Sequence, residues 1–276
     1  MKKTSLFATD LDGTLLRNNG SFSSSDIEAL ETLRTRGCAV VLATGRSPLS
    51  LRKCLGGRTL PVDWYVLSSG AGILNSIGEV ARSATLSPDN TADIHKAFVD
   101  LGITDTSIQG VFPDAHVLHW MEGKHCLDFR KRLAYYRDFS IKVASPNIPS
   151  TEVIGFVHPD QADLAISRLQ DAIGSCYSIV KATSPIDHKT VWIEVFAQGV
   201  NKASACNSIR EELEISMNST AAVGNDWNDV HMLRWADRSF VSGNAPDDLL
   251  DEFENVPSNE NNAVAVAVEK WLSELL

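Results

Sequence analysis

The chain has 276 residues, of which 43% are hydrophobic and 22% are charged, and its formal net charge at pH 7 is −10. This length is enough for one large domain or two modest ones, each with its own hydrophobic core. The negative field repels polyanions, and no run of Lys or Arg is able to track a phosphate backbone. We therefore exclude nucleic acid as the expected partner, and no obligate protein partner is evident.

The cysteines and the N-terminal segment indicate a reducing, cytoplasmic location. No apolar stretch approaches the roughly 18–20 residues that span a bilayer, and the apolar run Leu6–Ala8 is too short for a signal-peptide core. The cysteines are odd in number, scattered and without a CxxC pair, so we expect reduced, mostly buried thiols and no membrane association. They are Cys38, Cys54, Cys126, Cys176 and Cys206.

The first part of the chain predicts a doubly wound α/β sheet. The short apolar run Leu6–Ala8 is followed by a helical pattern over Ile27–Leu33. The continuous run Cys38–Ala43 is too short for a helix and apolar on both faces, as a central parallel strand requires. The run Trp64–Leu67 repeats this pattern. Alternation of strand and helix in this order is typical of a Rossmann-like parallel sheet.

The pattern changes between about Leu86 and Val195. Short alternating runs at 116–120, 153–158 and 191–196 are mixed with helical stretches at 90–101 and 160–172, which predicts a separate α+β unit. The parallel pattern then returns, with a helix from about 201, strands at 220–223 and 240–241, a helix at 228–236 and a final helix ending at 276. The simplest topology is an α/β core of residues 1–83 and 197–276, interrupted by an inserted α+β domain of residues 84–196.

Two carboxylates follow the first predicted strand. Asp10 and Asp12 lie one residue apart, and Gly13 lets the chain turn away sharply. Functional groups of parallel sheets sit beyond the carboxyl ends of the strands. Two acids there can divide the work, one as nucleophile and metal ligand and the other as general acid and base. The alternatives are an Asx-type turn without chemistry, or a calcium loop.

Two further segments supply positive charge and hydrogen-bond donors. Thr44, Gly45 and Arg46 follow the second strand and form a plausible cradle for phosphate oxygens. Lys202 begins the helix after Gly199 and could add a fixed charge beside a phosphate. The alternative for both Arg46 and Lys202 is an ordinary solvated side chain.

The loop that follows the strand at 220–223 is rich in oxygen donors. It packs two carboxylates and two carboxamides into five residues, Asn225, Asp226, Asn228 and Asp229 being the donors. Hard oxygen donors of this kind suit Mg²⁺. The joint order of DxDGTL, TGR, a lone Lys and GNDxND at predicted strand ends is far more specific than any one motif.

With these motifs the chain resembles the haloacid dehalogenase superfamily, specifically the Cof-type phosphatases of subfamily IIB, which carry a large cap inserted after the third core strand. The resemblance covers the whole length and includes Gly243–Pro246. It implies that Asp10 is the nucleophile, and that Asp12 protonates the leaving oxygen and then activates water. Thr44 and Lys202 would hold the transferring phosphoryl group, since positioning and charge neutralisation dominate this chemistry.

The resemblance also implies a Mg²⁺ site and a cap that closes over the active site to exclude water. Mg²⁺ would be bound by the Asp10 side chain, the Asp12 backbone carbonyl and the loop at 224–229. Further contacts to phosphate or substrate are expected from Gly45, Arg46, Ser69, Gly70 and Asn228.

Two departures from the family pattern leave alternatives open. Relatives commonly have Gly-Asp where this chain has Gly224 and Asn225, so the metal ligand is Asn225 through its side-chain oxygen, Asp226 shifted into place, or Asp229 through water. Relatives also tend to have Asn-Gly-Ala after the third strand, where this chain has Ser69, Gly70 and Ala71. This leaves the Ser69 contact open.

The sequence therefore predicts a Mg²⁺-dependent phosphohydrolase that acts on a small phosphate ester, such as a sugar phosphate or a phosphorylated cofactor, through an aspartyl-phosphate on Asp10. The alternatives are a phosphomutase and a non-catalytic, phosphometabolite-binding regulator. A pure binding protein has no need for both Asp10 and Asp12 at one strand end. His188 is either a substrate contact or a surface histidine, and Trp227 either a contact to cap or substrate or an aromatic at the core edge.

Overall fold

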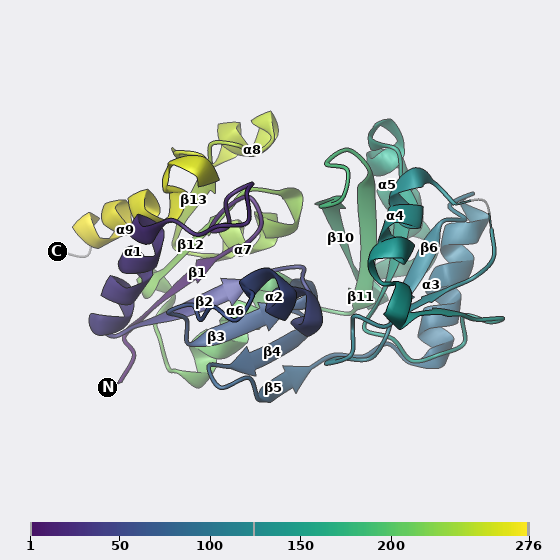
Figure 1. Cartoon of the computed structure of the whole chain (residues 1–276), viewed down its shortest axis with the longest axis horizontal. Coiled ribbons are helices and arrows are strands. Elements are labelled where there is room, and N and C mark those ends of the chain that lie inside the picture. The colour runs from purple at the N-terminus through teal and green to yellow at the C-terminus, as the bar shows by residue number, and fades with distance from the viewer. Residues whose placement is uncertain (1, 124, 275–276) are drawn as a thin grey trace. The chain divides into compact units, whose positions relative to one another are not determined.

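The structure is a computed structural model that describes residues 2–123 and 125–274. The chain forms two compact units. Unit 1 contains the described residues up to Arg46, Arg52–Arg82 and the described residues from Asn201 onward. Unit 2 contains Ser47–Leu51 and Ser83–Val200. Figure 1 labels the elements of both units.

Unit 1 is built on an eight-stranded sheet in the order β14-β13-β12-β1-β2-β3-β4-β5. The six strands from β14 to β3 are parallel, and β4 is antiparallel to β3. The strands are β1 (Ser5–Thr9), β2 (Cys38–Ala43), β3 (Trp64–Leu67), β4 (Gly72–Asn75), β5 (Val80–Ser83), β12 (Thr220–Gly224), β13 (Arg238–Ser242) and β14 (Glu254–Val256). The carboxyl ends of β1, β2, β3 and β12 therefore meet at one edge of the sheet.

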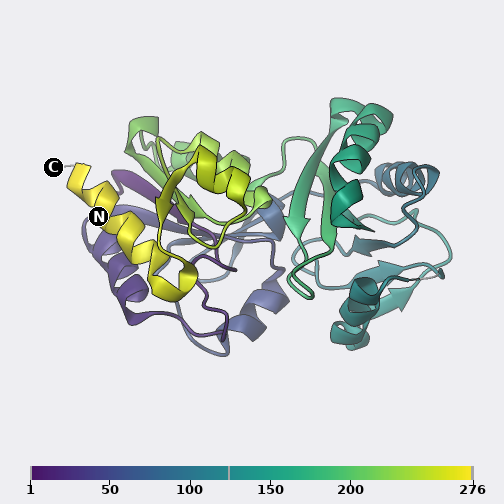
Figure 2. The same ribbon diagram turned by 90° about the horizontal axis from the view of Figure 1, so that it is seen from above.

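Helices cover both faces of this sheet. The helices of unit 1 are α1 (Ser24–Thr35), α6 (Lys202–Glu212), α7 (Val230–Trp235), α8 (Asp247–Glu252) and α9 (Ala263–Glu274), and α2 (Pro48–Leu55) begins within the segment assigned to unit 2. Leu6 and Ala8 of β1 point to one face and pack in a core with α6 and α7. Phe7 points to the other face, where its ring lies 5.7 Å from that of Trp271 on α9. Figure 2 shows purple α1 beside yellow α9. The predicted doubly wound α/β fold is confirmed.

Unit 2 is an α+β unit built on a six-stranded sheet in the order β10-β11-β9-β6-β7-β8. Its strands are β6 (Thr106–Gln109), β7 (Leu118–Trp120), β8 (Ser140–Lys142), β9 (Glu152–Val157), β10 (Tyr177–Thr183) and β11 (Val191–Ala197). Helices α3 (Pro88–Asp100) and α5 (Pro159–Ile173) pack on one face through residues such as Phe98 and Leu169. Helix α4 (Leu127–Tyr135) packs on the other face, where the ring of Phe129 contacts that of Phe156, which in turn contacts Trp192.

The predicted elements differ from the observed ones mainly at their ends. The strands at 38–43 and 64–67 have the predicted bounds, whereas the helix expected at 228–236 begins as a 3₁₀ turn, Trp227–Asp229, before α7. The end of the last helix at 276 lies outside the described residues. No helix in the described ranges is long and apolar enough to cross a membrane.

The expectation of mostly buried cysteines is wrong. Only Cys38 and Cys206 are buried, while Cys54 and Cys126 are half-buried and Cys176 is exposed, although all five are free thiols. The physical reason is position. The two buried cysteines lie on a central strand and on the core side of α6, and Cys176 lies in the surface turn that precedes β10.

Candidate active site

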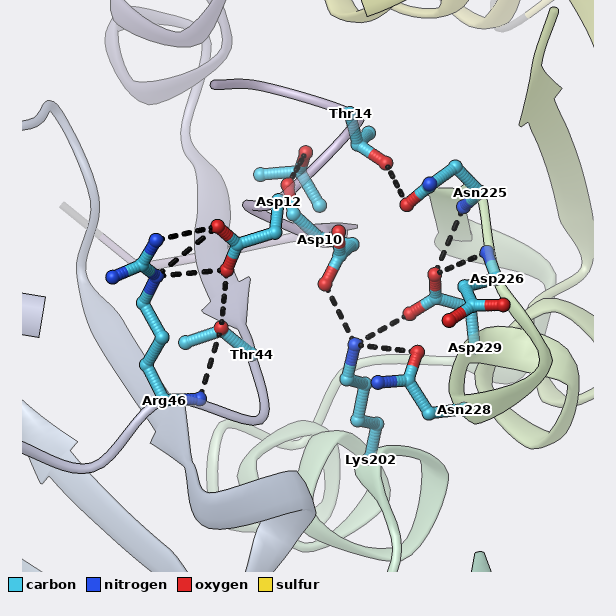
Figure 3. Close-up of polar contacts among 11 residues, drawn as sticks. Asp10, Asp12, Thr14, Thr44, Arg46, Lys202, Asn225, Asp226, Asn228 and Asp229 are labelled. Atoms are coloured by element: carbon cyan, nitrogen blue, oxygen red, sulfur yellow. Dashed lines mark hydrogen bonds and ion pairs between the residues drawn. The ribbon is translucent and has the colours of Figure 1, made fainter. Parts of the chain in front are cut away.

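The loop after β1 brings Asp10 and Asp12 to the carboxyl edge of the sheet (Figure 3). The backbone N–H of Asp10 donates to the carbonyl oxygen of Val223 on β12 at 2.9 Å, so the strand pairing continues up to the first carboxylate. Gly13 has φ +78°, and a Cβ built there would lie 2.4 Å from Nδ2 of Asn225. Only glycine combines this conformation with this close approach. Gly13 thus lets the acidic turn lie directly against the loop after β12.

Lys202 is buried at the centre of this cluster. Its Nζ donates to Oδ1 of Asp10 and to Oδ1 of Asp229, at 2.6 Å in both cases, and lies 3.4 Å from Oδ1 of Asn228. Asn201 is the N-cap of α6, and its side chain accepts a hydrogen bond from the backbone N–H of Ser204. This cap fixes the start of the helix and so the point from which the Lys202 side chain extends. The alternative of a solvated lysine is wrong, because the side chain is 0% exposed.

One ammonium group faces two buried carboxylates. Burial and the neighbouring Asp229 raise the pKa of Asp10 to about 8, although Lys202 opposes this change. Burial alone would lower the pKa of Lys202, but the carboxylates of Asp10 and Asp229 outweigh it and raise that pKa above its usual value. The cluster therefore has an excess of negative charge, which a proton on Asp10 or an added cation would neutralise.

Asp12 is held by Arg46 from the end of β2. The guanidinium Nε donates to Oδ2 of Asp12 at 2.8 Å and Nη2 donates to Oδ1 at 2.7 Å, which is a two-point ion pair. The hydroxyl of Thr44 lies 3.5 Å from the same carboxylate and accepts from the backbone N–H of Arg46 at 3.2 Å. The side chain of Asp12 is still 37% exposed. The reading of Arg46 as a merely solvated residue is therefore wrong.

The turn after β3 is tied to the same place. The backbone N–H of Ser69 donates to the carbonyl oxygen of Thr44 at 3.1 Å, and the Ser69 hydroxyl lies 3.4 Å from where a Cβ on Gly45 would be. Ser69 is buried and has φ +52°, a left-handed conformation that is strained for a serine. A Cβ on Gly70 would lie 2.3 Å from the carbonyl oxygen of Asn201. Gly70 thus allows this turn to contact the start of α6.

Asp229 shapes the loop after β12. Its Oδ2 accepts hydrogen bonds from the backbone N–H groups of Asn225 at 2.8 Å and Asp226 at 3.1 Å, while its Oδ1 accepts from Lys202. Both carboxylate oxygens are engaged and the side chain is fully buried. Asp226 is half-exposed. Asp229 thus fixes the path of the loop and the charge state of Lys202.

Asn225 is the loop residue whose side chain reaches Asp10 and Asp12. One of its two amide atoms lies 2.8 Å from the Asp12 carbonyl oxygen, 3.3 Å from Oδ2 of Asp10 and 3.1 Å from the Thr14 hydroxyl. With nitrogen in this position the amide donates hydrogen bonds to these oxygens. With oxygen there, the Thr14 hydroxyl donates to it, but it also faces two acceptors, the Asp12 carbonyl oxygen and Oδ2 of Asp10, which is favourable only around a cation.

The spacing of these oxygens fits Mg²⁺. In an octahedron with Mg–O distances of about 2.1 Å, neighbouring ligand oxygens are about 3 Å apart, close to the separations of the Asn225 amide atom from Asp12 and Asp10. No group of three His, Cys, Asp or Glu side chains in 2–123 or 125–274 is arranged to hold a metal. A metal held here would therefore depend on the Asp12 main-chain carbonyl and on the Asn225 carboxamide.

Several residues of this region lie outside the predicted set. Thr14 contacts Asn225 through its hydroxyl, and Asn244 donates from Nδ2 to the carbonyl oxygen of Gly13 at 2.9 Å. Thr14 is part of the DGTL motif and Asn244 of the Gly243–Pro246 stretch, but neither motif indicates the partner. Trp227 packs beside the Val241 core and donates to Asp248 at 3.0 Å, as an aromatic at the core edge does. In unit 2, His188 is exposed, as expected of a surface histidine.

Comparison with known proteins identifies the family. The sequence model of the haloacid dehalogenase-like hydrolases matches residues 7–268. The chain belongs to the haloacid dehalogenase-like hydrolases. Among curated proteins, the HMP-PP phosphatase of Enterobacter sp. (strain 638) is 28% identical over 280 residues, covering 98% of this chain and 96% of that protein. The HMP-PP phosphatase of Escherichia coli O8 (strain IAI1) is 27% identical, covering 97% and 95%. The chain is thus a phosphatase of this family.

Solved structures of the family share the fold along the whole chain. SMU.1108c from Streptococcus mutans UA159 has a TM-score of 0.79 at 19% identity, covering 98% of this chain and 100% of that one. The subclass IIB sugar phosphatase BT4131 has a TM-score of 0.75 at 19% identity, covering 97% and 99%. The predicted resemblance to the Cof-type phosphatases of subfamily IIB is therefore confirmed.

Proposed function

We propose that this phosphatase is a Mg²⁺-dependent enzyme that hydrolyses a small phosphorylated metabolite through an aspartyl-phosphate on Asp10. The observation that carries the proposal is the buried contact of Lys202 with both Asp10 and Asp229, at 2.6 Å each, beside a second and more exposed carboxylate, Asp12. A nucleophile held by a fixed cation next to a general acid is the arrangement that phosphoryl transfer through a covalent intermediate needs.

In the first step, an oxygen of the Asp10 carboxylate attacks phosphorus while the bond from phosphorus to the leaving oxygen breaks. Protonated Asp12 gives its proton to that leaving oxygen. In the second step Asp12 takes a proton from water, the water oxygen attacks phosphorus, and the bond to Asp10 breaks to release inorganic phosphate. Lys202 and the Thr44 hydroxyl neutralise and orient the phosphoryl oxygens, and the Asp12 carboxylate parts from Arg46 when it takes up the proton.

Asp10 through Oδ2, Asp12 through its carbonyl oxygen and Asn225 through its side-chain oxygen would hold Mg²⁺. When bound, the ion neutralises negative charge on the phosphoryl oxygens and on Asp10. Of the three ligands that the sequence left open, Asn225 has the best support, because its amide lies 2.8 Å from the Asp12 carbonyl, whereas both oxygens of Asp229 are already engaged. In this proposal residues 84–196 form the cap domain of the enzyme.

The first substrate to test is HMP-PP, which the names of the curated relatives indicate and which is a phosphorylated cofactor precursor. These relatives are similar along almost their full length, at 27–28% identity. Sugar phosphates come second.

The experiment measures phosphate release by purified protein with Mg²⁺ from HMP-PP, from several sugar phosphates and from an activated aryl phosphate. The matched control for Asp10→Asn is Asp171→Asn, the same change at an exposed position of unit 2. We expect turnover of HMP-PP or a sugar phosphate by wild type and Asp171→Asn, and none by Asp10→Asn. Absence of Mg²⁺-dependent phosphate release from every compound would overturn the proposal, and release from sugar phosphates alone would replace its substrate.

A further inference from the structure

A set of carboxamide side chains holds the loop that follows the second acid, Asp12. The loop Gly13–Asn18 follows Asp12 and contacts the segments after β13 and β14. Asn244 donates from Nδ2 to the carbonyl oxygen of Gly13 at 2.9 Å, and Asn259 donates from Nδ2 to the carbonyl oxygen of Leu16 at 2.9 Å. Two loop carbonyls are thus bound by side chains more than 200 residues away in sequence.

The two asparagines are bound to each other and have defined orientations. The side-chain oxygen of Asn244 accepts from the Ser242 hydroxyl at 2.6 Å and from the backbone N–H of Asn259 at 3.1 Å. Its nitrogen is therefore directed to Gly13. Asn259 is 2% exposed and also donates to the side-chain oxygen of Asn18 at 3.0 Å. Because both the oxygen and the nitrogen of the Asn244 carboxamide are hydrogen-bonded, it restrains the Gly13 carbonyl more firmly than a group with one hydrogen bond does.

The loop needs this support because of Gly13. Glycine leaves the peptide groups on either side of it freer to rotate than any other residue does. The carbonyl before Gly13 belongs to Asp12 and lies 2.8 Å from the Asn225 amide, and the hydroxyl after it belongs to Thr14 and lies 3.1 Å from the same amide. Asn244 binds the carbonyl between them. Holding this peptide group therefore restricts the rotation of the neighbouring Asp12 peptide group and the position of Thr14 beside Asn225.

We propose that Asn244 and Asn259 are positioning residues, which hold the Gly13–Asn18 loop so that the Asp12 carbonyl and the Asn225 side chain form a Mg²⁺ site. The inference rests on the proposed function. Neither asparagine touches the reacting atoms. Groups that orient a metal ligand typically change metal affinity or activity by about 10- to 100-fold when removed, so we expect Asn244→Ala to weaken Mg²⁺ binding by about tenfold.

The experiment compares Asn244→Ala and Asn259→Ala with Asn261→Ala. Asn261 lies in the same segment and is exposed, and its side chain donates to Ser258 rather than to the loop. Mg²⁺ binding is measured by titration calorimetry, and the mobility of the loop is measured without Mg²⁺ by hydrogen exchange of a peptide that spans residues 11–23. Asn244 is exposed, so its alanine variant folds even where truncating the buried Asn259 reduces stability.

We expect Asn244→Ala and Asn259→Ala to raise the Mg²⁺ dissociation constant about tenfold and to speed exchange in this peptide, with Asn261→Ala equal to wild type. At saturating Mg²⁺ the KM for the ester should stay within about twofold and kcat should largely recover, which a general loss of structure would not allow. If wild type binds Mg²⁺ and is active, but Asn244→Ala binds it as tightly as Asn261→Ala, the positioning role is wrong and the proposed function stands. If wild type neither binds Mg²⁺ nor hydrolyses any ester, the proposed function is wrong and this inference is wrong with it.

Discussion

Replacing Lys202 with methionine should destabilise unit 1 strongly. The substitution keeps an unbranched apolar stem but removes the ammonium group, which is 2.6 Å from each of two buried carboxylates. Breaking a buried ion pair by removing one partner costs about 3–5 kcal/mol, because the remaining charge is left buried and uncompensated. We take about 4 kcal/mol for Lys202→Met at neutral pH without Mg²⁺, which corresponds to a fall in Tm of about 8–16 °C.

The loss should depend on pH and on Asp229. The pKa of Asp10 is already raised to about 8 in the folded protein, and loss of Lys202 raises it further. A carboxyl group whose folded-state pKa lies above its unfolded value stabilises at low pH and loses this contribution as pH rises through the folded-state pKa. Because Asp10 loses its proton near pH 8 in wild type and only at higher pH in Lys202→Met, the deficit of Lys202→Met should grow as pH rises above about 8. Adding Asp229→Asn to Lys202→Met removes one uncompensated charge. The loss of unfolding free energy in the double variant should therefore be smaller than the sum of the losses in the two single variants, by at least about 2 kcal/mol.

The assay is urea unfolding without Mg²⁺, followed by tryptophan fluorescence. Trp64, Trp227, Trp235 and Trp271 lie in unit 1 and only Trp120 and Trp192 in unit 2, so the signal reports mainly unit 1. Wild type, Lys202→Met, Asp229→Asn and the double variant are measured at each pH. Two results would refute the reasoning. One is a Lys202→Met variant within about 1 kcal/mol of wild type, and the other is strict additivity of the two substitutions.

Mg²⁺ should raise Tm, and Asn225→Asp should lower the Mg²⁺ concentration for half of this rise by about tenfold, because a carboxylate replaces a carboxamide beside Asp12. Asp226→Asn should leave this concentration unchanged. An effect of Asp226→Asn without an effect of Asn225→Asp would move the ligand role to Asp226. Glu152→Gln should stabilise unit 2 increasingly as pH rises above about 5 in urea unfolding, because burial and Glu194 raise the pKa of Glu152 well above its usual value, so that the unfolded state releases a proton that the native state still holds. A pH-independent effect would contradict this. Gly70→Ala should lower the free energy of unfolding by about 3 kcal/mol or more and reduce turnover, because its Cβ would meet the Asn201 carbonyl at 2.3 Å. Gly57 also has a positive φ, but a Cβ there would have nothing within 4 Å, so Gly57→Ala should lower the free energy of unfolding by only about 1 kcal/mol. Equal losses in Gly70→Ala and Gly57→Ala would assign the effect at Gly70 to backbone strain alone.

The parts of the fold that follow from local patterns could be predicted from the sequence. The runs Cys38–Ala43 and Trp64–Leu67 are apolar on both faces because they lie inside a covered sheet, and the structure has strands with these bounds. Strands β5 and β14 have no such pattern, since they are short and mostly exposed at the two edges of the sheet. Periodicity contains no information about such strands, because neither face is consistently buried.

The candidate site could be predicted only as a set of strand ends. Parallel strands bring Asp10, Thr44 and the loop after β12 to one edge, and that much follows from topology. Which side chains meet depends on contacts that spacing does not contain, such as the ion pair between Arg46 and Asp12 or the burial of Lys202. The same limit applies to Gly70, because its close approach to the carbonyl oxygen of Asn201 is a tertiary contact that the spacing of residues does not contain.

The central claim is that Asp10 carries the phosphoryl group during turnover. The most direct test is to mix the enzyme with Mg²⁺ and a phosphate ester with an isotopic label in its phosphoryl group, to quench with acid on the time scale of one turnover, and to locate the label by peptide mass spectrometry. We predict label on the peptide that contains Asp10 in wild type and in Asp171→Asn, and neither label nor turnover in Asp10→Asn. Turnover without any label on the protein, or an Asp10→Asn variant that keeps more than about a tenth of wild-type activity, would contradict the covalent mechanism.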